Sequence, residues 1–461
     1  MSNASFSSRL GKCRALVVGL ARSGMAAARL LKRLGARVTA CDRLSDISGA
    51  QELSREGIEV VTGRDGPELL EGKDLLLLSP GVALNSPLCQ EARRAGVEIL
   101  GELELGWRLL REQADVAMLA VTGTNGKSTT CALCAHLLRR AGINAELAGN
   151  IGRPLCQVLL EDSRPRAAVV EVSSYQLEHL TRPDALDPQA AGWLNLTPDH
   201  LERHRTMENY AEMKRRLFLG QGPQHLAVFF ADDDFLRRSA TGIPGRLTWF
   251  GHQPERLGPQ DILIRGERLL LPGGGELLIR NRRLAGAHNA ENAACATALA
   301  MHLGLPPSAI QAGLDDYPGL PHRIEPVAEI NGVLFIDDSK GTNIDATIKS
   351  LGCFEQPIVL IAGGRGKGAG YEPLRPLVSQ HVRQLVLIGE EAERMEREFA
   401  GCAPVVRASS MEQAVELAFS LARPGDVVLL SPACASFDMF RDYAHRGEVF
   451  RQAVLSLLEA K

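Results

Sequence analysis

The first hundred residues alternate short apolar runs with segments whose apolar side chains recur at helical spacing. Residues 14–19 form a short β-branched run typical of a strand, and 23–34 carry an apolar helical face. The next predicted strand, 37–41, ends beside Asp42. Further strands are predicted at 58–62, 74–78 and 97–100. Because strands alternate with helices, the pattern predicts a parallel sheet covered on both faces.

The same alternation runs through two further segments. In the second, strands are predicted at 116–121, 167–172, 192–196, 225–230 and 245–250, a Gly-rich hairpin at 262–280, and helices at 127–141 and 287–303. In the third, strands are predicted at 333–336, 357–361, 384–388 and 426–430. We therefore expect an α/β protein of three domains, with a Rossmann-like N-terminal domain (1–105), a central P-loop ATPase-like domain with a mostly parallel sheet (106–319) and a Rossmann-like C-terminal domain (320–461).

Length and charge agree with this division and narrow the class of protein. At about 150 residues per domain, 461 residues correspond to three domains. The formal net charge of −3 argues against a nucleic-acid binder that works through a broad positive field. The N-terminus has no apolar secretory signal, and no run approaches the ~18 apolar residues of a membrane span. We therefore expect a cytoplasmic protein that binds neither a membrane nor a nucleic acid.

Ten cysteines fit a reducing compartment, since most lie among apolar neighbours. Cys131 and Cys134 form a C-x-x-C pair, but no second pair or histidine follows at zinc spacing. We expect these two thiols to pack in the core of the helix at 127–141.

The turn after the strand at 116–121 carries the strongest chemical signal in the sequence. It reads T-G-T-N-G-K-S-T, and Val121 stands where the strict phosphate-loop pattern has its first glycine. Glycines let backbone N–H groups point at phosphate oxygens, a lysine reaches the outer phosphates, and a hydroxyl binds Mg²⁺. ATP binding is therefore predicted for Gly123, Thr124, Asn125, Gly126, Lys127, Ser128 and Thr129.

The turn after the first strand is a weaker signal. Gly19 and Gly24 match half of a dinucleotide fingerprint, with Asp42 at the usual separation, but the middle glycine is missing. The residues alone leave three readings open: a nicotinamide cofactor, another phosphate ligand, or plain helix–strand packing.

Other polar groups follow predicted strands, where open α/β sheets bind ligands. Glu171 closes the strand at 167–172 and is placed to bind Mg²⁺, with a solvated strand end as the alternative. His200, next to Asp199, is as compatible with a metal ligand as with a structural cap. The stretches 335–343 and 431–438 are dense in polar residues and could be ligand-binding loops or surface turns.

Taken in order, these motifs resemble the Mur ligase family of peptidoglycan synthesis along essentially the whole chain. The matching segments are TGTNGKST (122–129), GNIG (149–152), EVSSYQLE (171–178), NLTPDHLERH (195–204), Tyr210-x-x-x-Lys214, GAHNAEN (286–292), LPHR (320–323), DDSKGTN (337–343) and SPACASFDMF (431–440). The last two motifs are similar to those of the member that adds D-glutamate to UDP-N-acetylmuramoyl-L-alanine.

The resemblance implies an ATP-dependent ligase that makes an acyl phosphate, which the amine of D-glutamate then attacks. It implies catalytic roles for Lys127, His200 and Lys214, with Lys214 carbamylated by CO₂. It implies two Mg²⁺ ions served by Ser128, Thr129, Glu171, His200 and carbamylated Lys214, and further ATP contacts from Asn289, Asn292, Arg323 and Asp338. Sequence alone also allows Lys214 to be an exposed helical lysine.

The resemblance also assigns the two other substrates and a monomeric enzyme. The UDP-linked substrate would contact Gly19, Arg22, Ser23, Gly24, Asp42, Arg43, Ser79, Gly81 and Asn150. D-Glutamate would contact Lys340, Thr342, Lys367, Ser436, Phe437 and Tyr443, which supply cations and hydroxyls for two carboxylates. The N-terminal turn is then a UDP site, with no nicotinamide implied.

Two positions depart from the family pattern. Arg365 stands where aspartate is frequent, and Arg43 where a small hydroxyl residue is common, so both add positive charge near anionic ligands. The competing hypotheses are a sister ligase for another amino acid, a folylpolyglutamate synthetase, and a nucleotide-regulated binding module without synthetic activity.

Overall fold

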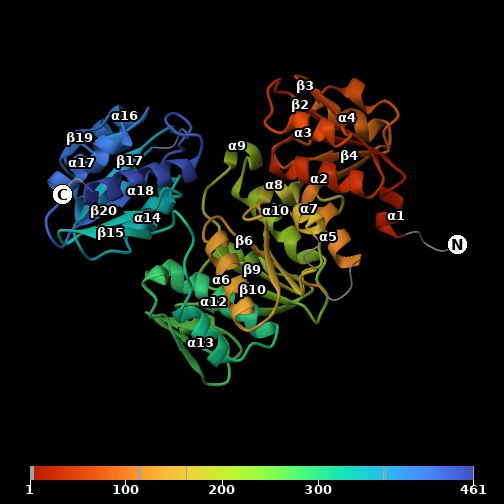
Figure 1. Ribbon diagram of the computed structural model, residues 1–461. Helices are drawn as coiled ribbons and strands as arrows, with labels where there is room; N and C mark the ends of the chain where they lie inside the picture. Colours follow the sequence, from red (N-terminus) through yellow and green to blue (C-terminus); the bar gives the residue numbers. More distant parts are fainter. Residues whose placement is uncertain (1–4, 113–115, 162–163, 367, 369, 460–461) are drawn as a thin grey trace. The chain divides into compact units, whose positions relative to one another are not determined.

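The computed structural model describes residues 5–112, 116–161, 164–366, 368 and 370–459. These residues form two compact units. The first runs up to Ile279 and includes Ala290–Asp316, and the second comprises Arg280–Asn289 and the residues from Tyr317 onward. The first unit contains two sheets and the second contains one (Figure 1).

The N-terminal sheet is parallel and has the strand order β3-β2-β1-β4-β5. Its strands are β1 (Arg14–Val18), β2 (Arg37–Asp42), β3 (Glu59–Thr62), β4 (Leu75–Leu78) and β5 (Glu98–Gly101). Its helices are α1 (Phe6–Leu10), α2 (Arg22–Arg33), α3 (Ala50–Arg55), η1 (Pro67–Leu70), α4 (Pro87–Arg94) and α5 (Glu102–Glu112). All predicted strands are confirmed, and Leu75–Leu78 is buried along its whole length, as a strand covered on both faces should be.

The central sheet has nine strands in the order β14-β13-β12-β11-β10-β9-β6-β8-β7. They are β6 (Ala117–Thr122), β7 (Ala145–Gly149), β8 (Ala167–Glu171), β9 (Ala190–Trp193), β10 (Leu226–Phe230), β11 (Arg246–Gly251), β12 (Ile262–Arg265), β13 (Arg268–Leu270) and β14 (Glu276–Leu278). The predicted hairpin is confirmed, because β12, β13 and β14 pair antiparallel. The strand predicted at 192–196 lies earlier, at Ala190–Trp193, which leaves Asn195 in a loop.

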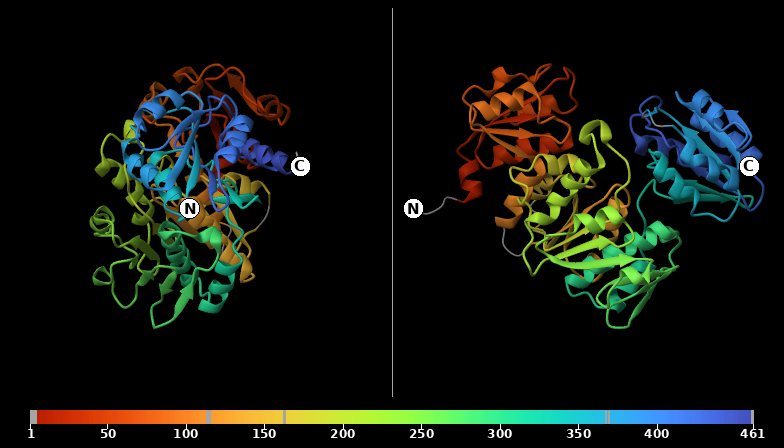
Figure 2. Two further views of the ribbon diagram at one scale, coloured as in Figure 1. Left: turned by 90° about the vertical axis from the view of Figure 1, so that its left-hand side faces the viewer. Right: turned by 180° about the vertical axis from the view of Figure 1, so that it is seen from behind.

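Helices of the central region flank this sheet (Figure 2). They are α6 (Lys127–Arg140), α7 (Leu155–Leu160), α8 (Ser174–Glu178), α9 (Leu201–His204), α10 (Met207–Leu219), α11 (Asp234–Ser239), η2 (Pro254–Arg256), α12 (Ala287–His302) and α13 (Pro307–Asp315). The short helix η3 (Arg282–Leu284) belongs to the second unit. Cys131 and Cys134 are buried in α6 as free thiols whose pKa values are raised by burial, which agrees with core packing.

The third sheet has the order β15-β16-β20-β17-β18-β19. Its strands are β15 (Glu325–Ile330), β16 (Val333–Asp337), β17 (Ile358–Gly363), β18 (Val382–Ile388), β19 (Val405–Arg407) and β20 (Val427–Leu430). Its helices are α14 (Ile344–Leu351), η4 (Glu372–Leu374), α15 (Arg375–His381), α16 (Ala392–Glu398), α17 (Met411–Leu421) and α18 (Tyr443–Glu459). Only β15 runs antiparallel within the described part of this sheet.

The predicted class, an α/β protein with three mainly parallel sheets, is therefore confirmed. The domain boundaries at residues 105 and 319 stay predictions. Across the described segments, none of the helices combines the length and apolar character needed to cross a membrane.

Candidate active site

The phosphate loop joins the central strand β6 to the start of α6, as the sequence predicts. Gly123 and Gly126 both have left-handed backbones, with φ of 151° and 83°. A side chain at Gly126 would collide with Asn292, whose Oδ1 lies 2.2 Å from the position of a Cβ there. Only glycine therefore fits this turn, which directs backbone N–H groups of the helix start to the carboxyl edge of the sheet.

Asn195 holds this loop in shape and was missed as an individual residue in the sequence analysis. Its Oδ1 accepts hydrogen bonds from the backbone N–H groups of Thr124 (3.1 Å) and Asn125 (2.9 Å). Its Nδ2 donates to the carbonyl of Asn125 at 3.2 Å. The signal available was its place in the NLTPDHLERH motif, directly after a buried strand. Asn195 thus fixes the loop from the segment that follows the neighbouring strand β9.

Two lysines converge on one carbonyl of the loop. The Nζ of Lys127 donates to the carbonyls of Gly123 (3.0 Å) and Thr124 (2.7 Å), and the Nζ of Lys214 donates to the same Gly123 carbonyl at 2.7 Å. Lys214 is only 1% exposed, which excludes the exposed helical lysine. Burial, and after it the charge of Lys127, lowers the pKa of Lys214 well below its usual value. A buried amine with a lowered pKa is therefore placed next to the phosphate loop.

Glu171 lies at the end of β8 with an incomplete set of hydrogen bonds. The residue is 2% exposed, and its Oε1 accepts from the Nδ2 of Asn150 at 2.7 Å. Its Oε2 is buried and has no hydrogen-bond partner among the described residues. A buried carboxylate oxygen without a partner is costly unless a cation is bound. The alternative of a solvated strand end is thereby excluded, and the donor set fits Mg²⁺.

His200 is held beside these groups in a left-handed conformation with φ of 54°. Its Nδ1 lies 3.3 Å from the hydroxyl of Tyr175, and its Nε2 lies 3.5 Å from a carboxylate oxygen of Asp199. Burial lowers its pKa, and the positive charges of Lys214 and Lys127 act in the same direction against the acidic neighbours. The imidazole is therefore neutral near pH 7 and able to ligate a metal.

The helix α10 brings one more group to the loop. The Tyr210 hydroxyl lies 3.4 Å from the Thr124 hydroxyl, and its ring lies 4.5 Å from the Nζ of Lys214. Ser128 and Thr129 are buried at the start of α6, and Thr130 donates to Asn292 at 3.2 Å. The predicted loop residues, Lys214, Glu171, His200 and Asn292 thus all belong to the first unit and surround one turn.

The N-terminal turn is closed by hydrogen bonds within its own sheet. Gly19 has φ of 88°, and a Cβ on Gly24 would lie 1.8 Å from the Gly19 carbonyl oxygen. The Ser79 hydroxyl donates to that carbonyl at 2.6 Å, and the Asp42 carboxylate accepts from the backbone N–H of Leu20 at 2.8 Å. Ser79 and Asp42, both predicted to contact the UDP-linked substrate, therefore stabilise the conformation of the turn.

The remaining residues predicted for the UDP-linked substrate are mostly exposed. Arg22 donates to the carbonyl of Gly152, in the GNIG motif of the central region. Arg43, Gly81 and Asn150 are exposed, and Ser23 is half-buried. The side chains of Arg43 and Asn150 and the backbone of Gly81 are therefore accessible to a ligand.

The second unit contains the other predicted ATP contacts, described here by themselves. Asp338 is buried, and its Oδ2 accepts from the hydroxyls of Ser350 (2.6 Å) and Ser431 (2.8 Å). Burial raises the pKa of Asp338 to about 6. Asn289 donates from its Nδ2 to the Ala285 carbonyl at 2.8 Å, and Arg323 follows His322 in the LPHR motif. Within this unit Asp338 acts as a core carboxyl joining two strand ends.

The residues predicted for D-glutamate gather in part at the carboxyl edge of the third sheet. The Nζ of Lys340 donates to the Tyr443 hydroxyl at 3.0 Å. Ser436 is 2% exposed and Phe437 63% exposed, on the loop that follows β20, and Thr342 is half-buried after β16. Lys367 lies outside the described residues.

Arg446 organises this edge and was missed in the sequence analysis. Its side chain is fully buried, and burial lowers its pKa to about 10. It donates to the Ser339 carbonyl at 2.7 Å and to the Cys434 carbonyl at 3.2 Å. It therefore joins the DDSKGTN and SPACASFD loops. The only sequence signal was a lone arginine within a helix, which is usually a surface residue.

Arg365, one of the two departures from the family pattern, forms an ion pair with a nearby carboxylate. Its guanidinium binds both carboxylate oxygens of Glu390, at 3.0 and 3.2 Å. Its backbone exchanges two hydrogen bonds of 2.9 Å with Ala435. The added positive charge is thus neutralised locally. The other departure, Arg43, is exposed, and no structural reason for it emerges.

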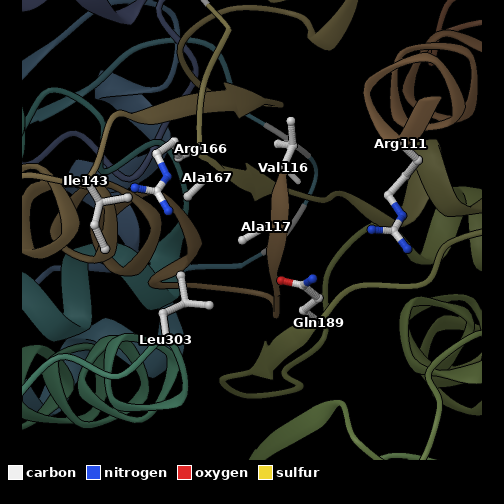
Figure 3. A pocket seen from close by; sticks show the side chains of 8 residues that line it. All are labelled: Arg111, Val116, Ala117, Ile143, Arg166, Ala167, Gln189 and Leu303. Carbon is white, nitrogen blue, oxygen red and sulfur yellow. The ribbon is translucent and has the colours of Figure 1, made fainter. Parts of the chain in front are cut away.

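One well-formed hollow of 490 Å³ lies elsewhere in the first unit (Figure 3). Its lining residues are Arg111, Val116, Ala117, Ile143, Arg166, Ala167, Gln189 and Leu303. Five of them lie at or just before the amino ends of β6, β8 and β9, and the other three come from α5, the segment before β7 and the end of α12. The phosphate loop, in contrast, follows the carboxyl end of β6. This hollow is therefore separate from the predicted chemistry.

A phosphate loop with two lysine side chains and a buried carboxylate beside it, in an α/β chain with a second glycine turn, defines a nucleotide-dependent enzyme. Three family models match the chain: the MurD-like N-terminal domain of Mur ligases at 13–101, the Mur ligase middle domain at 121–300, and the Mur ligase glutamate ligase domain at 322–434. The chain belongs to the Mur ligase family.

Curated relatives match along almost the full length. A UDP-N-acetylmuramoylalanine–D-glutamate ligase of Myxococcus xanthus is 42% identical over 454 residues, covering 96% of this chain and 98% of the relative. The ligase of the same description from Anaeromyxobacter dehalogenans is 43% identical over 457 residues, covering 95% and 96%. A solved UDP-N-acetylmuramate–alanine ligase of Thermotoga maritima has a TM-score of 0.62 at 19% identity, covering 98% of this chain and 100% of that chain, and supports the fold.

Proposed function

We propose that this protein is an ATP-dependent ligase that adds D-glutamate to UDP-N-acetylmuramoyl-L-alanine in peptidoglycan precursor synthesis. The full-length relatives from Myxococcus xanthus and Anaeromyxobacter dehalogenans, at 42% and 43% identity, are described as UDP-N-acetylmuramoylalanine–D-glutamate ligases. The observation that carries the chemistry is the buried amine of Lys214 on the carbonyl of Gly123, beside the partnerless oxygen of Glu171. These groups suit a reaction in which negative charge develops next to bound phosphates.

The substrate carboxylate attacks the γ-phosphorus of ATP, ADP leaves, and an acyl phosphate forms. The amine of D-glutamate then attacks the acyl carbon and loses a proton, and the tetrahedral intermediate collapses with loss of phosphate. Lys127 and the loop N–H groups hold the outer phosphates in both steps. Because Lys127 contacts two loop carbonyls in the described structure, it exchanges these contacts for phosphate oxygens when ATP binds.

Two Mg²⁺ ions would neutralise the phosphate charge and polarise the transferred group when bound. Ser128, Thr129, Glu171 and His200 are the residues proposed to hold them. The depressed pKa of Lys214 supports carbamylation, because only the neutral amine reacts with CO₂. The carbamate carries anionic oxygens in place of the ammonium and joins this ligand set.

The remaining proposed contacts divide between the two units. Asn292 in the first unit, and Asn289, Arg323 and Asp338 in the second, are proposed for the ATP base, ribose and phosphates. Gly19, Arg22, Ser23, Gly24, Asp42, Arg43, Ser79, Gly81 and Asn150 are proposed for the UDP-linked substrate. Lys340, Thr342, Lys367, Ser436, Phe437 and Tyr443 are proposed for D-glutamate. We further propose that the enzyme acts as a monomer in the cytoplasm.

Phosphate release tests the proposal directly. ATP, Mg²⁺ and UDP-N-acetylmuramoyl-L-alanine are supplied with D-glutamate, L-glutamate, L-alanine or a diamino acid in parallel reactions. Of the amino acids tested, only D-glutamate should cause phosphate release. The UDP-linked product should then gain the mass of one glutamyl residue. Release that does not depend on D-glutamate would overturn the assignment of the amino acid.

A further inference from the structure

A backbone carbonyl of the N-terminal domain is held by two side chains of the central domain. Val82 ends the Ser79–Val82 turn after β4, where its N–H donates to the Ser79 carbonyl at 3.0 Å. The Val82 carbonyl accepts from the Nε2 of His179 at 2.9 Å and from the Nη2 of Arg203 at 3.4 Å. His179 follows α8, and Arg203 lies on α9. We call His179, Arg203 and the Val82 carbonyl the Val82 clamp.

The turn held by this clamp packs directly on the N-terminal glycine turn. A Cβ placed on Gly19 would lie 2.9 Å from the Ser79 Cβ and 3.6 Å from a methyl group of Val82. The Ser79 hydroxyl donates to the Gly19 carbonyl at 2.6 Å. A shift of the Val82 carbonyl would therefore move the side chains of Ser79 and Val82, which pack next to Gly19.

The other side of the clamp leads to the catalytic face of the central domain. The Nε of Arg203 donates to Glu178 at 2.9 Å, and its guanidinium lies 5.6 Å from the Tyr175 ring. The Tyr175 hydroxyl lies 3.3 Å from the Nδ1 of His200. The helix α8, which carries Tyr175, begins three residues after Glu171. The helices next to the clamp, α8 and α9, thus follow two proposed Mg²⁺ ligands, Glu171 and His200, in the chain.

The protonation state of His179 suits its hydrogen bond to the Val82 carbonyl. It is 3% exposed, and burial lowers its pKa, so the imidazole is neutral. A carbonyl only accepts, so Nε2 carries the proton. Its Nδ1 is then a buried acceptor with no hydrogen-bond partner among the described residues. An unsatisfied buried nitrogen costs stability, which indicates that the Nε2 contact has a use other than stability.

We propose that the Val82 clamp positions the Ser79–Val82 turn for the UDP-linked substrate and ties it to the Mg²⁺-binding face. The inference rests on the proposed function, in which that substrate occupies the N-terminal glycine turn. His179 and Arg203 are positioning residues, since they act through Val82. Their loss weakens binding of the UDP-linked substrate and leaves ATP and D-glutamate binding unchanged.

Steady-state kinetics with each substrate varied in turn test this proposal. His179→Leu removes the donor at similar volume, and His179→Gln restores a donor at the position of Nε2. For His179→Leu the KM of UDP-N-acetylmuramoyl-L-alanine should rise about tenfold, the usual effect of one buried hydrogen bond. The KM values of ATP and D-glutamate should stay within about twofold, and His179→Gln should recover most of the loss.

Arg203→Met provides a second variant on a more accessible helix, and it should raise the same KM with a smaller factor. His302→Leu is the matched control, because His302 lies at the end of α12 and lines a separate hollow with Leu226 and Arg246. An unchanged KM for the UDP-linked substrate in both clamp variants, or an equal rise for all three substrates, would overturn the clamp. Wild-type turnover that ignores D-glutamate would instead overturn the proposed function, so the two failures are distinguishable.

Discussion

The first unit contains two glycine turns with the same local construction and different surroundings. Each joins a central parallel strand to a helix, β1 to α2 and β6 to α6, and each has a left-handed glycine, Gly19 (φ 88°) or Gly126 (φ 83°). Around the N-terminal turn the polar groups hydrogen-bond backbone atoms of the turn. Around the central turn Asn195, Lys127 and Lys214 also hydrogen-bond backbone atoms, but a buried carboxylate and a histidine with a lowered pKa lie there in addition.

The two turns thus share their backbone construction and differ in the side chains that neighbouring strands place around them. In the central sheet β8 and β9 flank β6 and end in Glu171 and the loop of Asn195 and His200. In the N-terminal sheet β2 and β4 flank β1 and end in Asp42 and Ser79, which are used to close the turn. We therefore expect substitutions at the central turn to affect turnover, and those at the N-terminal turn to affect binding of one substrate.

Lys214→Ala should produce the largest loss. It removes the proposed carbamate, and we expect kcat to fall by about 10³-fold, as for a lost group that stabilises the transition state. Phosphate release with all three substrates measures it. Acetate or bicarbonate should restore part of the activity by supplying a carboxylate. Lys12→Ala, at the start of the N-terminal domain, is the control, and full activity of Lys214→Ala would contradict the carbamate.

Glu171→Gln should reduce turnover by about 10²-fold, because an amide keeps the shape but removes the anionic oxygen. The Mg²⁺ concentration needed for half-maximal activity should rise in the same variant. Glu161→Gln, a more exposed carboxylate after α7, should behave like wild type. An unchanged Mg²⁺ dependence would remove Glu171 from the metal site.

Lys214→Met should stabilise the protein while abolishing activity. The lowered pKa of Lys214 means that the folded state resists protonation, so stability is lost as pH falls below the lysine's unfolded value. In CO₂-free buffer at pH 7 the variant should gain about 2 kcal/mol in the free energy of unfolding. Denaturant unfolding at pH 7 and pH 10 measures it. The gain should shrink at pH 10, and an equal gain at both pH values would contradict burial as the cause.

Asp42→Asn should have the smallest effect. One backbone contact of the N-terminal turn is weakened, so the KM for the UDP-linked substrate should rise about fivefold with kcat unchanged. Kinetics at saturating ATP and D-glutamate measure it, with Asp46→Asn as the neighbouring control. A drop in kcat equal to that of Glu171→Gln would show that the two turns do not divide binding from chemistry.

Most strands and both glycine turns could be predicted from the sequence, because interior parallel strands are continuous apolar runs. The strands β7, β15 and β19 were missed, and each lies at the edge of its sheet. Edge strands are less enclosed, so polar residues interrupt their apolar pattern, as in Glu325–Ile330 (EPVAEI).

The site residues that escaped prediction depend on contacts far apart in the chain. Asn195 acts on Thr124 and Asn125 only because β9 pairs with β6, and Arg446 reaches Ser339 across more than a hundred residues. Neither pairing leaves a local pattern. For Lys214 the sequence predicted a position one helical turn after Tyr210, but it did not predict that the side chain is buried.

The pairing of Arg365 with Glu390 bears on how sequence variation at this loop should be interpreted. The two side chains form one neutral unit, so a substitution at either position alone leaves an unbalanced charge, whereas a joint exchange keeps the sum. Ligases with an acidic residue at position 365 are accordingly expected to carry a basic or neutral residue at position 390. A change that looks radical at one of the two positions would then be conservative for the charge of the pair.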